Sequence, residues 1–229
     1  MNVVVSFFHA HALWVLLCVA TLSSFLWILK SKAKLKLTWY ASLILAVVHT
    51  LVGVAAVKAF AFLESIGEPV KGNMSLFGAV FALPLFYLAG SLIFKRKKED
   101  VFDVLTLATV ITLFMARINC FIGGCCLGIE LANGSRVPTR ELELLFYFIL
   151  FNVLYVLILK GRLYGRAYPL FMLSYGAFRF VTEFFRESER IYLGAFHLAH
   201  LWALISLIIG LCFFIILTGK HRKSPKRKS

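Results

Sequence analysis

Long apolar runs, separated by short polar segments, dominate the chain. Each run can cross about 30 Å of hydrocarbon as a helix, because a helix rises about 1.5 Å per residue. The pattern therefore predicts an all-α, polytopic membrane protein with seven transmembrane helices in a single domain, residues 1–219. We expect these helices at roughly residues 10–29, 39–62, 76–94, 101–122, 142–159, 167–185 and 195–217.

The polar segments between the runs differ in charge. Alternate segments are basic: "KSKAKLK" (30–36), "KRKKED" (95–100), "KGRLYGR" (160–166) and the tail "KHRKSPKRKS" (220–229). They hold 17 Lys and Arg residues, against five in the other loops. Because basic loops stay in the cytoplasm, we expect the N-terminus outside and the C-terminus inside. We expect the basic tail to be disordered.

The composition agrees with a membrane protein. The chain is 61% hydrophobic with a mean hydropathy of +0.86, which excludes an ordinary soluble domain. The net charge of +14 could indicate nucleic-acid binding, but the basic residues are confined to short loops and fit a topology signal better. We therefore expect a membrane partner and no nucleic acid. The first run lacks a basic leader, so we expect a retained helix rather than a removable signal peptide.

Several charged side chains fall inside the predicted helices. Measured along the helix from its cytoplasmic end, Arg117 lies about 24 Å up, Arg179 about 18 Å and Glu183 about 24 Å. Glu143 lies in the first turn of its helix, and His200 lies near the outer end of the last one. Their shared depth predicts a polar cavity that opens toward the outer leaflet, since charges in a membrane are costly without a function.

Simpler explanations exist for most of these side chains. Glu143 and His200 could lie at the membrane interface, where polar groups are ordinary. Arg179 and Glu183 are four residues apart and could form a purely structural pair. Arg117 is harder to explain, because it keeps its charge and lies too deep to reach water, so it needs an anionic partner. A carboxylate would serve, and so would a lipid phosphate, which matches the guanidinium fork.

The stretch "ARINCFIGGCCLG" (116–128) ends the fourth apolar run with glycines and three cysteines. Cys120, Cys125 and Cys126 lack the paired C-x-x-C spacing and an obvious fourth ligand, so we expect no metal site and no cofactor. A redox role for Cys125 and Cys126 is an alternative, and small-residue packing is the simplest explanation of Cys126.

Two motifs in the chain match a known family signature. "ARINCFIGGCCLG" aligns with G-R-I-G-N-F-I-N-G-E-x-x-G, and "YGAFRFVTEFFRE" (175–187) aligns with Y-G-x-x-R-x-x-x-E-F-F-R. "VPTRELE" (137–143) and "GNMSLFGAV" (72–80) resemble two further blocks, and the blocks keep the family's order. On these motifs the chain resembles the prolipoprotein diacylglyceryl transferase family, whose members have seven spans.

The resemblance implies an enzyme of the bacterial cytoplasmic (inner) membrane. Such an enzyme moves a diacylglyceryl group from phosphatidylglycerol to the lipobox cysteine of a prolipoprotein, so that a thioether forms and glycerol phosphate leaves. It implies that Arg117 and Arg179 bind the lipid phosphate, and that Glu183 and Tyr175 orient them or share proton transfer. The implied substrate-binding residues are Arg186, Glu143, Gly128, Cys120, Cys125 and His200.

Four departures from the family pattern affect residues that could take part in the chemistry. Cys120 and Cys125 replace an asparagine and a glutamate, and Phe77 and Val137 replace two histidines. With a family base missing, His200 and Glu183 are the base candidates. Three alternatives stay open: a non-catalytic protein that binds or transports anionic lipid, a phospholipid head-group transferase with another acceptor, and an enzyme that uses Cys125 as a covalent nucleophile.

Overall fold

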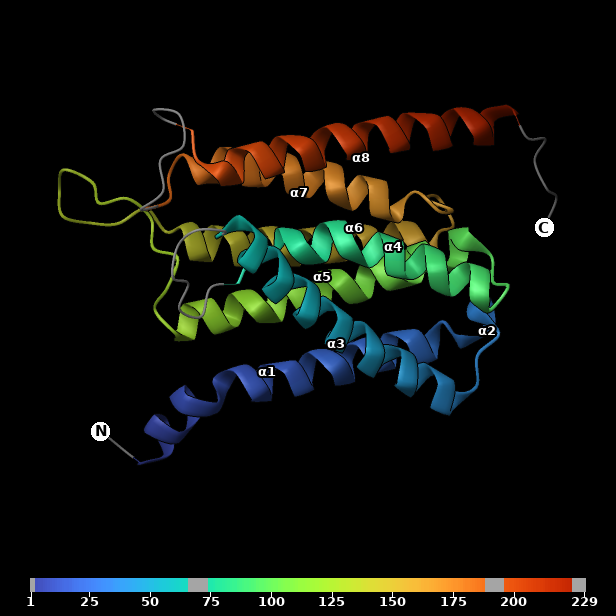
Figure 1. Ribbon diagram of the computed structural model, residues 1–229, viewed down its shortest axis with the longest axis horizontal. Coiled ribbons are helices and arrows are strands. Elements are labelled where there is room, and N and C mark those ends of the chain that lie inside the picture. The colour runs from blue at the N-terminus through green and yellow to red at the C-terminus, as the bar shows by residue number, and fades with distance from the viewer. Residues whose placement is uncertain (1–2, 66–73, 188–195, 224–229) are drawn as a thin grey trace.

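The computed structural model of the protein describes residues 3–65, 74–187 and 196–223, which form an elongated helical bundle (Figure 1). Within these ranges the prediction of an all-α fold is confirmed, and each of the seven apolar runs contains a helix. A short additional helix, α2, lies in the first basic loop. The helices are α1 (Val3–Lys30), α2 (Lys32–Leu35), α3 (Trp39–Glu64), α4 (Phe77–Ile93), α5 (Lys98–Ile122), α6 (Thr139–Leu159), α7 (Ala167–Glu183) and α8 (Leu198–Lys223).

Five of the described helices, α1, α3, α5, α6 and α8, are long and apolar enough to cross a membrane. Helix α4 is apolar but has only 17 residues, and α7 has 17 residues and carries polar side chains. Helix α5 is the central one: 61% of its most apolar stretch is buried inside the protein, against 17% for α8. The chain is therefore a polytopic membrane protein built around α5.

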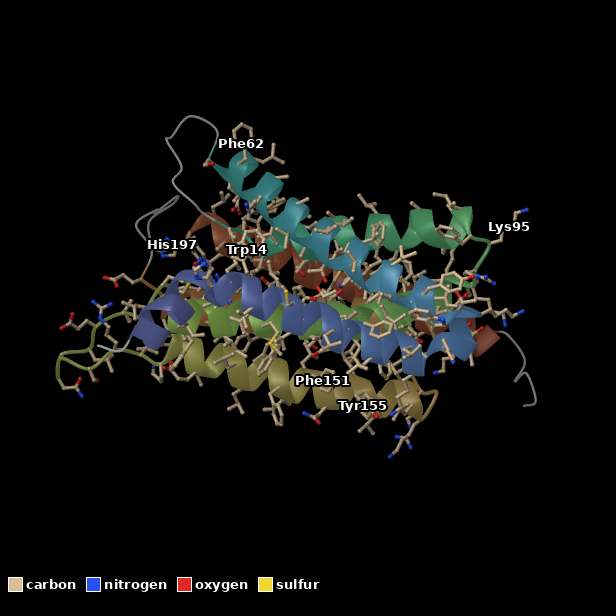
Figure 2. All side chains as sticks on the ribbon, turned by 90° about the horizontal axis from the view of Figure 1, so that it is seen from below. Trp14, Phe62, Lys95, Phe151, Tyr155 and His197 are labelled. Carbon is tan, nitrogen blue, oxygen red and sulfur yellow. The ribbon has the colours of Figure 1, made fainter. Side chains whose placement is uncertain are left out.

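The long helices run along the long axis of the molecule, and the start of α1 and the end of α8 lie at opposite ends (Figure 1). The segments 30–36, 95–100 and 160–166 gather at the end that holds α2. Lys95 marks this end in Figure 2, and His197 marks the opposite one. Helix α8 continues through Lys223. Residues 224–229 of the predicted tail lie outside the described residues, and so do Lys71 and Arg190.

Helix α7 is positioned by contacts at its start and along its side. The Asp103 carboxylate of α5 accepts hydrogen bonds from the backbone N–H groups of Gly165 (2.7 Å) and Ala167 (3.1 Å), which satisfies donors at the helix start. Farther along, a Cβ on Gly176 would lie 2.6 Å from the Ala203 carbonyl oxygen of α8. Glycine therefore allows α7 and α8 to pack backbone against backbone.

A buried polar contact joins α3, α4 and α5 in the middle of the bundle. The Tyr87 hydroxyl lies 2.6 Å from Thr109 Oγ1 and 3.2 Å from His49 Nδ1, and donates to the Leu105 carbonyl oxygen at 3.3 Å. Sequence analysis did not single out these residues. The polar groups of these residues are hydrogen-bonded to one another, so they can be buried in an apolar core.

Candidate active site

The Glu143 carboxylate lies between two buried arginines, at the end of the bundle opposite the basic loops. One of its oxygens pairs with Arg117 Nε, and the other accepts from Arg179 Nη1 at 2.6 Å. Glu143 comes from the second turn of α6, Arg117 from the last turns of α5 and Arg179 from the C-terminal half of α7. All three residues are less than 7% exposed. The prediction that these side chains lie together in the bundle is confirmed.

The ion pairs continue from Arg179 along α7. Arg179 Nη2 lies 2.9 Å from Glu183 Oε2, and Arg186 Nη1 lies 3.8 Å from the same oxygen. We call these five residues, Arg117, Glu143, Arg179, Glu183 and Arg186, the arginine network. It contains three arginines and two glutamates, so it carries one positive charge in excess.

The excess positive charge affects Arg186 most directly. Burial lowers the pKa of its guanidinium, and the nearby charges of Arg179 and Arg117 lower it further. The group still stays charged, because arginine does not lose its proton in proteins. An uncompensated positive charge in a poorly solvated site favours the binding of an anion.

Aromatic rings line the network on one side. The Tyr175 ring is fully buried, with its centroid 5.5 Å from that of Phe77 and 6.5 Å from that of Tyr147. Tyr147 lies one turn after Glu143 on α6, so both side chains share a face of that helix. Tyr147 was not predicted as a site residue. Its spacing of four residues from Glu143 could have placed it on the same helix face.

The loop between α5 and α6, residues 123–138, is held against the segment that follows α7. An isolated antiparallel β-bridge pairs Gly128 with Arg186. The Ile129 N–H donates to the Phe185 carbonyl at 2.9 Å, and the Glu187 N–H donates to the Leu127 carbonyl at 3.0 Å. These bonds connect the two sequence motifs through the backbone.

Gly128 has a packing reason for being glycine. A Cβ at this position would lie 2.1 Å from the Val137 carbonyl oxygen, inside any allowed contact distance. Arg136 Nη1 donates to the Gly128 carbonyl at 3.3 Å and pairs with Glu187 at the rim. In this structure Gly128 thus lets the loop fold tightly beside Arg186.

Three cysteine side chains meet beside Arg117. Cys120 lies in the last turn of α5, and Cys125 and Cys126 lie in the loop that follows. Their sulfur atoms all lie within 4.8 Å of one another, and all three thiols are free. Arg117 Nη1 is 4.0 Å from Cys120 Sγ, so the three thiols adjoin the arginine network.

The surroundings of the three cysteines lower the pKa of the Cys126 thiol. Hydrogen bonds with the Cys120 and Cys125 thiols lower the pKa of the Cys126 thiol, and the positive charges of Arg186 and Arg117 act in the same direction. Cys126 also has a left-handed backbone, with φ of +62°, and its carbonyl accepts a hydrogen bond from Thr139 Oγ1 at 3.2 Å. The loop conformation holds Cys126 toward its two neighbours.

His200 lies in the first turn of α8, where it is buried among aromatic rings. Its ring centroid is 4.4 Å from that of Phe184 and 5.4 Å from that of Phe180. Nδ1 accepts a hydrogen bond from the His197 N–H at 3.0 Å, and Nε2 is buried with no hydrogen-bond partner among the described residues. His200 contacts α7 but lies outside the ion pairs.

Two apolar cavities adjoin the central helix α5. One lies among α1, α3, α4 and α5, and its lining includes Ala116 and Asn119, the neighbours of Arg117 on α5. The other lies among α1, α5 and α6 and is lined by Tyr147 and Phe151, among others. Both cavities therefore run close to the arginine network.

Comparison with known proteins gives consistent matches. A family model described as prolipoprotein diacylglyceryl transferase matches residues 3–216. A phosphatidylglycerol–prolipoprotein diacylglyceryl transferase of Clostridium tetani is 27% identical over 140 residues, which cover 53% of this chain and 56% of the relative. The enzymes of that name from Mannheimia succiniciproducens (27% over 172 residues, 68% of this chain) and Erwinia tasmaniensis (33% over 94 residues, 41% of this chain) are also similar. The matched region spans 64% and 32% of those two relatives, so the chain covers less than two thirds of each.

Proposed function

Because this chain belongs to the prolipoprotein diacylglyceryl transferase family, we propose that it transfers a diacylglyceryl group from phosphatidylglycerol to the lipobox cysteine of a prolipoprotein. The product is a thioether, and glycerol phosphate leaves. The observation that carries this proposal is the buried network in which Glu143 holds Arg117 and Arg179 side by side, with one positive charge in excess.

The proposed enzyme lies in the bacterial cytoplasmic membrane with seven spans, the N-terminus outside and the C-terminus inside. Two features support this orientation: the basic segments share one end of the bundle, and the start of α1 and the end of α8 lie at opposite ends (Figure 1). The arginine network then lies near the outer face, where a precursor emerges after translocation. Helices α4 and α7, at 17 residues each, are long enough to span only with their flanking residues.

The lipid phosphate would bind at Arg117 and Arg179, with Arg186 at the rim. A phosphate there competes with Glu143 for the two guanidinium groups and neutralises the excess charge. The two apolar cavities beside α5 are suited to acyl chains, since their linings are almost entirely apolar. The lipid would thus have its phosphate at the network and its chains along the central helix.

In the reaction, the acceptor sulfur attacks the glyceryl carbon that carries the phosphate ester, and the C–O bond to phosphate breaks. Arg117 and Arg179 stabilise the negative charge that develops on the leaving phosphate. Of the two base candidates, we favour Glu183, because it belongs to the network, whereas His200 lies between phenylalanine rings. Tyr175 forms part of the aromatic wall and orients the arginines.

Purified protein in vesicles of phosphatidylglycerol, incubated with a lipobox peptide, tests the proposal. We expect a thioether-linked diacylglyceryl peptide by mass spectrometry, and we expect Arg117→Ala to abolish it. Arg162→Ala is the matched control, because Arg162 is exposed at the opposite end of the bundle. Normal lipid binding without any product from the unsubstituted protein would contradict the transferase proposal.

One observation favours a second candidate, a non-catalytic protein that binds anionic lipid. Phe77 stands where the resembled family has a histidine, and its buried ring packs edge-on against Tyr175. A phenylalanine cannot accept a proton, so this chain needs another base. The same vesicle experiment separates the candidates, because both bind lipid but only the enzyme forms the thioether.

A further inference from the structure

The three thiols of Cys120, Cys125 and Cys126 have no role in the lipid-binding part of the proposed site. Their sulfur atoms lie within 4.8 Å of one another, and the sulfurs of Cys125 and Cys126 are 3.6 Å apart. One cysteine comes from a helix and two from the loop that the β-bridge holds in place. Packing of small residues does not require three sulfurs to converge in this way.

The spacing of the sulfurs matches a metal–thiolate site. A zinc ion bound to thiolates at about 2.3 Å with tetrahedral angles places the sulfur atoms about 3.8 Å apart. Here the sulfur atoms are 3.6 Å apart in one pair and at most 4.8 Å apart in the others. Each sulfur atom would have to move by about 1 Å or less to reach the spacing of a zinc site. Rotation of exposed or half-buried thiols can supply such shifts.

The surroundings fit the charge of such a complex. Three thiolates and one Zn²⁺ carry a net charge of −1, and the positively charged Arg117 lies beside the three cysteines. Arg117 Nη1 lies 4.0 Å from Cys120 Sγ, so the two charges would adjoin. A Cu⁺ ion, in contrast, would have a complete coordination shell with three thiolates, and the complex would carry a charge of −2.

We propose that Cys120, Cys125 and Cys126 bind a zinc ion through their three sulfur atoms and leave its fourth position open. The Cys125 side chain is exposed and the other two are half-buried, so the cluster is open on one side. Zinc sites with three protein ligands and one open position are those that bind a substrate or water. The sequence led us to expect no metal site, because the spacing along the chain does not show that the loop returns Cys125 and Cys126 to Cys120.

The open position suits the thiol of the acceptor, and this step rests on the proposed function. An acceptor R–SH binds zinc as a thiolate, and its proton passes to the Glu183 carboxylate. The zinc-bound sulfur then forms the C–S bond while the C–O bond to phosphate breaks. The electron pair of that bond stays on glycerol phosphate, which leaves with the proton held by Glu183. Zinc would thus ionise the thiol where the family histidine is absent.

Metal content of the purified protein tests the site without reference to activity. After purification with zinc, we expect about one zinc ion per chain, and a Co²⁺-loaded sample should show thiolate-to-cobalt charge-transfer absorption. Cys120→Ser, Cys125→Ser and Cys126→Ser should each lower the zinc content at least about tenfold. Cys18→Ser and Cys212→Ser are the matched controls, because these free cysteines are exposed on α1 and α8.

Three outcomes would overturn the site: no bound metal, binding of Cu⁺ alone, or zinc that is lost equally in the two control variants. A failure of the acceptor step is distinguishable. Zinc binding with thioether formation that persists after chelation would leave the site but contradict thiol activation. Zinc binding without any transfer would contradict the proposed function and leave the metal site standing.

Discussion

Glu143 holds the arginine network together at the scale of single residues. Its two oxygens pair with Arg117 and Arg179, so its removal leaves two buried guanidinium groups facing each other. Breaking a buried ion pair in this way costs about 3–5 kcal/mol. We expect Glu143→Ala to lower the free energy of unfolding by about that amount, measured by denaturation in detergent.

A matched control separates this effect from a general effect of charge on α6. Glu141→Ala removes an exposed carboxylate near the start of the same helix and should change the free energy of unfolding by less than about 0.5 kcal/mol. Equal losses in the two variants would contradict the central role of Glu143.

The shape of the guanidinium group matters as much as its charge. Arg117 uses Nε toward Glu143 and Nη1 toward Cys120, and Arg179 uses two different nitrogens for Glu143 and Glu183. Lysine offers one point charge in place of this fork. We therefore expect Arg117→Lys and Arg179→Lys to lose transfer almost as completely as the alanine variants, in the vesicle assay. Substantial rescue by lysine would contradict two-pronged phosphate binding.

Most residues of the arginine network were predictable from the sequence, but the partner of Arg117 was not. Helix geometry alone placed Arg117, Arg179 and Glu183 at one depth, because rise per residue is fixed. Whether a carboxylate or a phosphate faces Arg117 stayed open, since that depends on how α6 packs against α5; the structure places Glu143 there. The meeting of the cysteines could not be predicted, because a loop with φ of +62° at Cys126 returns the chain on itself.

At the scale of elements, the loop 123–138 connects the two sequence motifs. Its β-bridge to Arg186 depends on Gly128, where a Cβ would collide with the Val137 carbonyl oxygen. We expect Gly128→Ala to release the loop and to reduce transfer, while the helix content stays unchanged. Hydrogen exchange should increase at the amides of Ile129 and Glu187, which are hydrogen-bonded across this contact.

Gly90→Ala provides the control for this loop variant. Gly90 lies inside α4, and a Cβ there would meet nothing within 4 Å. Alanine is the better helix former, so this variant should keep full activity and exchange protection at the loop. Unchanged exchange at Ile129 in Gly128→Ala would show that the bridge does not depend on the glycine.

The elements themselves were largely predictable. Each of the seven apolar runs contains a helix, because a membrane requires each span to satisfy its own backbone hydrogen bonds. The bounds differ most at the start of α1, which begins at Val3, and at the end of α8, which continues to Lys223. The short helix α2 and the β-bridge beside Gly128 were not predicted, since local turns depend on contacts between distant segments. The family predicted from the motifs is confirmed by the match over residues 3–216.

At the scale of the whole molecule, the basic segments and the candidate active site lie at opposite ends of the bundle. The basic segments lie at one end and the arginine network at the other, and many large apolar side chains are exposed along the helices between them. If the basic end is cytoplasmic, the network and the three cysteines face the outside, where lipobox precursors arrive. The orientation therefore decides whether the proposed acceptor can reach the site.

Single cysteines introduced into a variant without native cysteines test this orientation in intact cells. Ala132→Cys lies in the exposed loop between α5 and α6, and Lys160→Cys lies in the exposed turn after α6. We expect a membrane-impermeant maleimide to label Ala132→Cys directly and Lys160→Cys only after the cells are permeabilised. The reverse pattern would place the arginine network on the cytoplasmic side, where a secreted precursor could not meet it, and the transferase proposal would fail with the topology.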